Sequence, residues 1–202
     1  AFTPDPPTCR RWHAAGPTLL PEMGARSCLI MPTDNNFESL RDGVRSVVSQ
    51  FDSRYWQDLD QARAFPEKFV EALTKAGWLS ALIPEEYGGT NLSLVEASVI
   101  MEEINRAGGN SGACHGQMYV MACVVRHGSE AQKQALLPKI ASGELRMQSM
   151  AVTEPTTGSD TTQLKTFAQR LGDRYVVNGQ KVWTSRLQHS DFMLLLARTT
   201  PL

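Results

Sequence analysis

Apolar residues recur at helical spacing through the first two thirds of the chain. Pro66 suits the first turn of a helix, and Phe69, Leu73 and Ala76 follow at intervals of four and three residues. Residues at these intervals share one face of a helix, and glycine is typical of helix ends. We therefore predict a helix that begins at Pro66 and stops before Gly77.

Two further helices follow with recognisable ends. Residues 91–93 offer caps for a helix that closes at 108–109, and Asn110 or Ser111 starts the next one, which runs to Gly128. The apolar face of the first of these helices consists of Leu94, Ala97, Met101 and Ile104.

The last predicted helix begins at Ser129, with Gln132 placed three residues later as in a capping box. Pro138 lies deep in the same helical pattern and has no amide donor, so we expect a kink or a break there. Helices joined by short loops, without strands between them, indicate an α-helical bundle. We assign residues 31–146 to this N-terminal α-helical domain.

A strand pattern replaces the helical one after Gly143. Residues 165–171 alternate loosely between apolar and polar positions, and residues 175–177 form a second strand-like run. Residues 172–173 between them are typical of a turn. This part of the chain therefore predicts a β-hairpin.

A second hairpin is predicted at Asn178 and Gly179, a dipeptide typical of a tight β-turn. Residues 181–183 return from it, and residues 192–197 predict a buried strand. These strands form an antiparallel meander, but they are too few to close a sandwich or a barrel, so the sequence looks cut within a domain. The predicted fold class is α+β, an N-terminal all-α helical bundle followed by a truncated antiparallel β-domain, partial and covering residues 147–202.

Residues 1–30 differ from the rest of the chain. They hold five of the 11 prolines and show no apolar periodicity. An organellar transit peptide is rich in arginine and serine, poor in acids and amphipathic, and this segment fits that description badly. We predict a disordered extension here, with a transit peptide as the alternative.

Composition narrows the possible classes of function. The 202 residues carry 20 basic and 21 acidic side chains, so a formal charge of −1 indicates no nucleic-acid partner. No apolar run approaches the roughly 18 residues of a membrane-spanning helix. Four cysteines, none in a Cys-x-x-Cys pair, indicate neither a disulfide framework nor structural zinc. We expect a soluble protein of a reduced compartment, without a metal site.

Two groups of residues have the composition of catalytic sites. Ser185, His189 and Asp191 supply the residue types of a nucleophilic triad, but triads assemble from distant segments, so we favour a polar loop. Glu96 and Glu103 share a helix face, which we interpret as solvated rather than as a carboxylate pair acting across a substrate.

Familiar metal and nucleotide motifs are absent from the sequence. Adjacent Cys114 and His115 diverge around a helix, so they do not predict a metal site. The sequence contains no Gly-x-Gly-x-x-Gly, Walker or His-Glu-x-x-His motif. Nucleotide binding through a Rossmann phosphate turn is therefore unsupported.

Residues 150–160 form the remaining candidate site. They read Met-Ala-Val-Thr-Glu-Pro-Thr-Thr-Gly-Ser-Asp, an apolar strand end that enters a turn rich in small and hydroxyl side chains. The amides and hydroxyls of such a turn suit the polar edge and the phosphates of a cofactor. A linker between domains is the equally weighted alternative.

This segment resembles the flavin-binding signature of the acyl-CoA dehydrogenases. Four further stretches resemble the same family in order and spacing: 84–89, a loop between early helices; 128–144, the helix before the β-domain; 178–181, a hairpin; and 183–185, a Trp motif beside the flavin. The resemblance covers residues 37–199.

The resemblance implies FAD-dependent α,β-dehydrogenation of acyl-CoA thioesters. In this chemistry a glutamate takes the α-proton, and the β-hydrogen leaves as a hydride to the flavin. The family carries that glutamate in a C-terminal helical bundle, which also helps to form a tetramer and is absent here. We therefore expect no catalytic residue in this chain, an incomplete subunit that is inactive alone, and we interpret Glu154 as structural.

The resemblance also assigns residues to the cofactor. Backbone amides near Val152 and Thr153 bind the pyrimidine edge of the flavin, the Ser185 hydroxyl lies near N5, and the Trp183 indole packs against the rings. Ser159 faces the ribityl or pyrophosphate region and the pantetheine arm of the substrate. The full set of expected cofactor residues is Met150, Val152, Thr153, Gly158, Ser159, Trp183, Thr184 and Ser185.

Four residues depart from the family pattern. Thr157 stands where a small residue is usual, and Gln163 stands where Gly, Ser or Ala is usual, so the approach of the loop to its ligands changes. Arg186 and Leu187 follow the Trp motif where many relatives have Asn-Gly, so we expect a different turn there.

Two other functions stay open at this point. One is an acyl-CoA oxidase, which lets oxygen reach the reduced flavin; the other is a non-catalytic, truncated interaction module. The expected partners are an acyl-CoA, an electron-transfer flavoprotein as electron acceptor and copies of the same chain in a homo-oligomer. The expected location is the bacterial cytoplasm, with the mitochondrial matrix as the alternative, and the sequence does not define the acyl chain.

Overall fold

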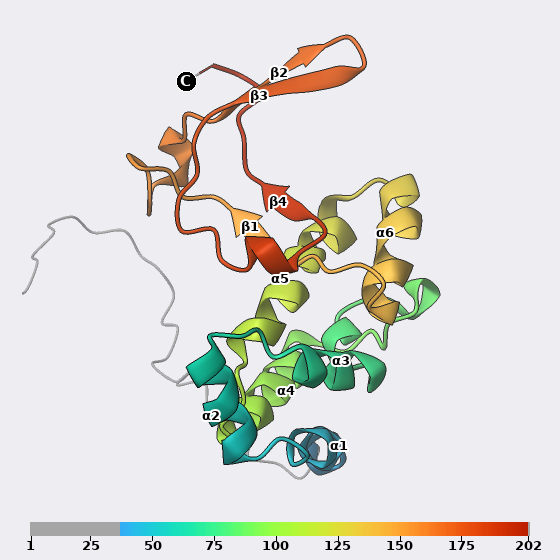
Figure 1. The fold of residues 1–202 in the computed structure, drawn as a ribbon. Coiled ribbons are helices and arrows are strands. Elements are labelled where there is room, and N and C mark those ends of the chain that lie inside the picture. The colour runs from blue at the N-terminus through green and yellow to red at the C-terminus, as the bar shows by residue number, and fades with distance from the viewer. Residues whose placement is uncertain (1–36, 202) are drawn as a thin grey trace, which may run out of the picture. The chain divides into compact units, whose positions relative to one another are not determined.

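Helices form the first part of the described chain and short strands the last part (Figure 1). The structure is a computed structural model that describes residues 37–201, so the extension predicted at 1–30 lies outside the described residues. The helices are α1 (Glu38–Val48), α2 (Ser53–Ala62), α3 (Glu67–Lys75), α4 (Leu94–Arg106), α5 (Gly112–His127) and α6 (Glu130–Ser142). The strands are β1 (Ser149–Ala151), β2 (Phe167–Leu171), β3 (Arg174–Asn178) and β4 (Met193–Leu195).

Caps confirm where three of the predicted helices begin. Ser93 accepts a hydrogen bond from the Glu96 amide, and the Glu96 carboxylate accepts one from the Ser93 amide, which completes a capping box on α4. Ser129 and Gln132 form a second capping box on α6. Pro66 occupies the N-cap of α3, one position ahead of its first turn.

Of the kink or break predicted at Pro138, the break is wrong, because α6 continues through the proline to Ser142. Proline removes one amide donor from a helix, but Leu137 and Ile140 on either side of it are fully buried. Burial of such a side chain contributes about 1.5–3 kcal/mol, which offsets the missing hydrogen bond. Pro138 itself is exposed, so the turn that lost its donor is open to water.

Two hydrophobic clusters hold the helices together. The first joins α1, α3, α4 and the start of α5, and it contains Phe69, against which the rings of Phe51 and Trp56 pack edge-on at 5.2 and 4.8 Å. The second joins the rest of α5 to α6 and the segment leading into β1, through residues such as Met121 and Met147. The described helices therefore form the predicted bundle.

Glu103 overturns the interpretation of the α4 carboxylates as a solvated face. Glu96 serves the capping box, whereas Glu103 is only 1% exposed and accepts hydrogen bonds from Arg41 and Arg45 on α1. Burial by itself raises the pKa of Glu103, but the bonds from Arg45 and Arg41 outweigh it and hold the pKa below its usual value. The spacing of residues on α4 shows which positions share a face, but not that two arginines of α1 lie opposite.

The strand pairing is only partly antiparallel. β2 and β3 form the predicted hairpin around residues 172–173, with Phe167 opposite Asn178. β1 pairs with β4 in parallel, with Ser149 opposite Met193. The α+β class is confirmed, but the antiparallel prediction is wrong for β1 and β4, because a connection well over a dozen residues long lets a strand return in the same direction.

The second predicted hairpin, at Asn178 and Gly179, is wrong. Asn178 ends β3, and no strand follows in residues 179–186. A type I′ turn needs a positive φ at both central residues, and neither of these two residues has one. Gly179 instead permits a close approach, because a Cβ at this position would overlap the Thr166 hydroxyl.

Strand β4 lies within the predicted strand 192–197, but this segment is not buried as predicted. Phe192, Leu195 and Leu196 are all exposed in the described chain. The described helices and strands form one compact unit, so the domain boundary at 146/147 stays a prediction from the sequence. Among the helices of residues 37–201, none has both the length and the apolar character needed to cross a membrane.

Candidate functional site

The two predicted cofactor segments meet, although they lie far apart in the sequence. The amide of Val182 donates to the carbonyl of Thr153 over 2.9 Å. Beside it, Lys181 Nζ donates to the carbonyl of Val152 over 2.8 Å. Trp183 follows directly, so residues 152–153 of the first segment lie beside the start of the second.

Glu154 closes the loop that follows β1. Its carboxylate accepts hydrogen bonds from the amides of Lys165 and Thr166, at 2.6 and 2.8 Å, and from Lys181 Nζ at 3.0 Å. Hydrogen bonds, chiefly from Thr166 and then from Lys165 and Lys181, lower the pKa of Glu154 to about 2. A carboxylate that is held ionised and saturated with donors is a poor proton acceptor, which supports the structural interpretation of Glu154.

The loop after Glu154 presents open hydrogen-bond donors. Gly158 and Ser159 are exposed, and a Cβ at Gly158 would meet no atom within 4 Å. Among the described residues, the amides of Val152, Thr153 and Ser159 donate to no other backbone carbonyl. Unpaired amides next to an uncrowded glycine suit a phosphate or the polar edge of a ring.

Internal contacts explain one departure from the family pattern in this loop. Thr157 is buried, its amide and carbonyl pair with the backbone of Glu154, and its hydroxyl donates to the carbonyl of Gln163 over 3.2 Å. Asp160 caps the short turn 161–163 by accepting a hydrogen bond from the Thr162 amide. The extra atoms of Thr157 therefore point into the loop and do not crowd its exposed side.

Trp183 stands out from the surface, with 87% of the residue exposed. Its φ of 61° is left-handed, a conformation that costs a residue other than glycine on the order of 1–2 kcal/mol. The next two residues are Thr184, which is half-buried, and Ser185, which is exposed. An exposed indole on such a backbone is typical of a residue positioned for a ligand rather than for the core.

Arg186 closes the turn after Ser185 with a second left-handed conformation, at a φ of 58°. Its carbonyl accepts hydrogen bonds from the Ser190 hydroxyl at 3.0 Å and from the His189 amide at 3.1 Å. Asparagine is enriched at such φ values, which accounts for the Asn in the pattern that this turn resembles. Arg186 places a longer, charged side chain at this left-handed position, and the different turn expected here stays a prediction.

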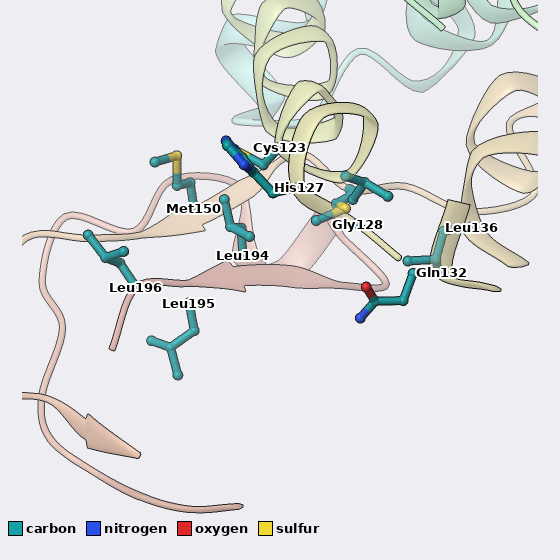
Figure 2. A pocket seen from close by; sticks show the side chains of 11 residues that line it. Cys123, His127, Gly128, Gln132, Leu136, Met150, Leu194, Leu195 and Leu196 are labelled. Atoms are coloured by element: carbon teal, nitrogen blue, oxygen red, sulfur yellow. The ribbon is translucent and has the colours of Figure 1, made fainter. Parts of the chain in front are cut away.

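Met150 belongs to a different feature, an apolar groove between α5, α6, β1 and β4 (Figure 2). Its volume of about 470 Å³ is within the range of small-molecule pockets. Met150 and Leu194 point toward the end of α5 that carries Cys123 and His127. The lining residues are Cys123, Val124, His127, Gly128, Gln132, Leu136, Met147, Met150, Leu194, Leu195 and Leu196.

The sequence did not indicate this groove. Of the eight predicted cofactor residues, only Met150 lines it. The parallel pairing of β1 with β4 brings its walls together, and that pairing was not predicted. The apolar run at 192–197 is consistent with a strand that lines a groove, but it is equally consistent with a strand buried on both faces, which is what we predicted.

Ser185, His189 and Asp191 do not form a triad. The carboxylate of Asp191 accepts a hydrogen bond from the Arg146 amide at 2.7 Å, and His189 stacks on Phe65 with ring centroids 4.4 Å apart. Within residues 37–201, no hydrogen bond joins any two members of the three. These contacts support the interpretation as a polar loop.

Cys114 and His115 point to different environments, as their adjacency on a helix predicts. Cys114 is fully buried, whereas His115 is exposed. Burial raises the pKa of the Cys114 thiol to about 12, so this thiol stays protonated. In the part of the chain that the structure describes, no cluster of His, Cys, Asp and Glu side chains is arranged to hold a metal ion.

Comparisons with known families match nearly the whole chain beyond its first 33 residues. Residues 34–144 match the family described as "Acyl-CoA dehydrogenase, N-terminal domain", and residues 149–202 match "Acyl-CoA dehydrogenase, middle domain". The match to the N-terminal domain precedes the match to the middle domain along the chain.

Individual relatives agree with these matches. The chain is 32% identical over 185 residues to mitochondrial isovaleryl-CoA dehydrogenase of Bos taurus, which is 86% of this chain and 43% of that protein. It is 36% identical over 170 residues to (2S)-methylsuccinyl-CoA dehydrogenase of Cereibacter sphaeroides, 82% of this chain and 30% of that protein. An acyl-CoA dehydrogenase structure from Geobacillus kaustophilus superposes with a TM-score of 0.75 at 30% identity, over 85% of this chain and 45% of that one. The chain thus spans less than half the length of these relatives.

Proposed function

The chain belongs to the acyl-CoA dehydrogenase family, and from this we propose that its protein is an FAD-dependent enzyme that desaturates an acyl-CoA thioester between the α and β carbons. The observation that carries the proposal is the junction of residues 150–159 with residues 183–185 through Val182 and Thr153. This junction places the open amides of residues 152–153 next to the segment that carries the exposed Trp183, and the uncrowded Gly158 lies farther along the same loop.

The donor set at this junction fits a flavin. The amides of Val152 and Thr153 would bind the pyrimidine edge, where main-chain donors stabilise negative charge. The indole of Trp183 would lie on the ring system, and the hydroxyl of Ser185 would hydrogen-bond near N5. When bound, FAD accepts the β-hydrogen of the substrate as a hydride.

The loop 157–160 would serve the phosphate end of the cofactor. Gly158 leaves room for close approach, and Ser159 offers an unpaired amide beside an exposed hydroxyl. We assign Ser159 to the ribityl or pyrophosphate region and to the pantetheine arm of the substrate. Thr184, between two residues that face the flavin, would contribute through its backbone.

The proton-accepting base is proposed to lie outside the described residues. Removal of a proton α to a thioester needs a base in a dry pocket whose pKa is raised. Glu154, the buried carboxylate nearest this site in the sequence, has the opposite property, because its pKa is lowered to about 2. The described residues are therefore proposed to bind and orient the reactants, and to be inactive without the rest of the subunit.

The partners are part of the same proposal. We expect a homo-oligomer that passes electrons to an electron-transfer flavoprotein, in a bacterial cytoplasm or a mitochondrial matrix. The acyl group stays open, since the relatives named above include an enzyme for the neutral, branched isovaleryl group and one for methylsuccinyl, which ends in a free carboxylate.

FAD binding tests the proposal directly. The purified protein is expected to be yellow or to take up FAD, and Trp183→Ala is expected to weaken FAD binding about 5- to 10-fold through loss of aromatic stacking. Tyr175→Ala, which removes an exposed aromatic ring from β3, is the matched control and is expected to leave the affinity unchanged. A protein that neither contains FAD nor takes it up contradicts the proposal and favours a non-catalytic interaction module.

The electron acceptor separates a dehydrogenase from an oxidase. With acyl-CoA as reductant, a dehydrogenase reduces an electron-transfer flavoprotein and forms little hydrogen peroxide, whereas an oxidase forms peroxide in step with substrate consumption. Stoichiometric peroxide would overturn the assignment as a dehydrogenase while leaving the flavin site intact.

A further inference from the structure

The side chain of Arg186 lies along the N-terminal half of α5, over a face formed by two glycines. A Cβ built on Gly116 would lie 3.2 Å from both Nε and Nη2 of Arg186, and a Cβ built on Gly112 would lie 3.6 Å from Nη1. The absence of a side chain at Gly116 therefore leaves space for the guanidinium, whereas a Cβ at Gly112 would be in ordinary contact with it. The arginine itself is one of the departures from the family pattern, since many relatives have Asn-Gly at the positions of 186 and 187.

The charge on Arg186 has no counter-ion in the described chain. Its Nε is buried and has no hydrogen-bond partner. Arg186 takes part in none of the ion pairs formed among residues 37–201. It also lies beside the first turns of α5, and the N-terminal end of a helix favours anions rather than cations. A partly buried, unpaired cation at such an end costs free energy, which a bound anion would recover.

The backbone of Gln148 lies beside the same glycine. The backbone oxygen of Gln148 lies 2.9 Å from the Cβ position of Gly116. The Gln148 side chain is only 1% exposed, yet neither its amide nitrogen nor its amide oxygen has a hydrogen-bond partner. Buried amides almost always have partners. The backbone of Gln148 thus faces the same turn of α5 as the unpaired Nε of Arg186.

The position of Arg186 selects the part of an acyl-CoA that it can meet. It directly follows Ser185, whose hydroxyl is proposed to lie near flavin N5, where the β-carbon of the substrate reacts. The guanidinium is therefore close to the acyl group, whereas the whole pantetheine arm separates the reacting carbons from the phosphates of CoA. A substrate anion that contacts Arg186 would therefore be part of the acyl group and not a phosphate of CoA.

We propose that Arg186 binds a free carboxylate at the far end of a short acyl group, so that the substrate is a dicarboxylic acyl-CoA. This inference rests on the proposed function and specifies its substrate class. The planar guanidinium is suited to a carboxylate, which it binds through two parallel hydrogen bonds. A neutral acyl group would leave the charge of Arg186 unpaired.

The test compares glutaryl-CoA, which ends in a carboxylate, with pentanoyl-CoA, which ends in a methyl group at the same chain length. The FAD-loaded complete subunit is expected to prefer glutaryl-CoA over pentanoyl-CoA in kcat/KM by at least 10-fold. Arg186→Gln is expected to lower kcat/KM for glutaryl-CoA on the order of 10- to 100-fold, the range of a hydrogen bond to a charged group, and to change pentanoyl-CoA less than about 3-fold. Arg186→Lys keeps the positive charge but loses the pair of parallel N–H donors, and it is expected to retain part of the preference for glutaryl-CoA. Arg170→Gln on β2, a change at an exposed arginine, is the matched control.

Binding without turnover gives a second measurement. A non-reactive CoA thioether that carries a terminal carboxylate is expected to bind the wild-type protein more tightly than its methyl-terminated counterpart, and Arg186→Gln is expected to abolish that difference. This readout, like the preference of the wild-type protein, does not depend on the activity of the variant.

The outcomes separate this inference from the function on which it rests. A complete subunit that takes up no FAD and oxidises no acyl-CoA overturns both. A protein that oxidises both probes equally well, or whose Arg186→Gln variant loses the same factor on both, overturns only the carboxylate assignment and makes Arg186 a packing residue of α5.

Discussion

The helical region and the strand region of this protein differ in how far they bury their large apolar side chains. In the helices, large side chains such as Phe69, Ile100 and Met121 are fully buried in clusters formed within the described chain. In the strand region, which begins at residue 147, several large apolar side chains from β3 onward, such as Tyr175 and Leu196, are exposed. Packing therefore stabilises the helical region, and the strand region must be held by other contacts.

Those other contacts are polar. Glu154 gathers two amides and Lys181, and Asp191 accepts from the amide of Arg146. Arg198 exchanges backbone hydrogen bonds with residues 166–168 next to β2. The comparison implies that apolar truncations damage the helical region most, whereas the strand region is most sensitive to loss of a few charged or hydrogen-bonded groups.

The largest expected effect is the loss of Phe69 from the helical core. Phe69→Ala removes a fully buried ring that packs against Phe51 and Trp56, so the free energy of unfolding is expected to fall by about 3–5 kcal/mol. The same kind of truncation in the strand region, Tyr175→Ala, removes a ring that is 57% exposed and is expected to cost less than about 1 kcal/mol. Denaturant unfolding of both variants measures the difference, and equal losses would break the comparison.

A somewhat smaller effect is expected where the helical region buries a charge. Glu103→Ala leaves Arg41 and Arg45 without their shared carboxylate, and the expected loss is about 3 kcal/mol, at the lower end for a broken buried ion pair because both arginines still reach water. Glu102→Ala, next to it on α4, removes a half-exposed carboxylate that pairs with Arg41 and is expected to cost less than about 1 kcal/mol. If the two losses are equal, Glu103 does not join α1 to α4.

In the strand region the most sensitive single group is expected to be Glu154. Glu154→Gln deprives the buried ammonium of Lys181 of its partner, and the melting temperature is expected to fall by roughly 5 °C. The pKa of Glu154 is about 2, well below its ordinary value of 4.5, so its stabilising effect is complete above pH 4.5 and is lost as the pH falls toward 2. Melting curves between these pH values are expected to show a steeper decline for the wild-type protein than for the variant, and parallel curves would contradict this role.

The same contrast explains which structural features were predictable from the sequence. Helices α4 and α6 were predictable because their caps and apolar faces are local properties of consecutive residues. The parallel pairing of β1 with β4 was not, because it joins segments separated by a long connection that no local pattern constrains. The helix break predicted at Pro138 was wrong for a related reason. The burial of Leu137 and Ile140, which stabilises α6 there, comes from neighbours elsewhere in the fold.

The candidate site also has features that the sequence predicted and features that only the tertiary structure shows. Its residues were found through a resemblance to a family signature, while their meeting through Val182 and Thr153 is a tertiary contact. Glu103 and the groove at Met150 were missed because each depends on what lies opposite, on α1 in one case and on β4 in the other. The spacing of residues in the sequence shows which side chains share a face of one helix or strand. A site also depends on which helix or strand packs against that face, and the spacing does not show this.

The smallest expected effect sharpens the comparison within a single helix. Ser93→Ala removes the cap that accepts the Glu96 amide at the start of α4, which is expected to cost about 1 kcal/mol in the free energy of unfolding. Ser98→Ala makes the same chemical change one turn later, where the hydroxyl donates only to the carbonyl of Leu94 on the exposed face, and alanine is the better helix former. The second variant is therefore expected to stay within about 0.5 kcal/mol of the wild-type protein. If denaturant unfolding gives equal values for the two variants, local capping does not set the start of α4, and the packing of Ile100 and Ile104 against the core alone determines where this helix forms.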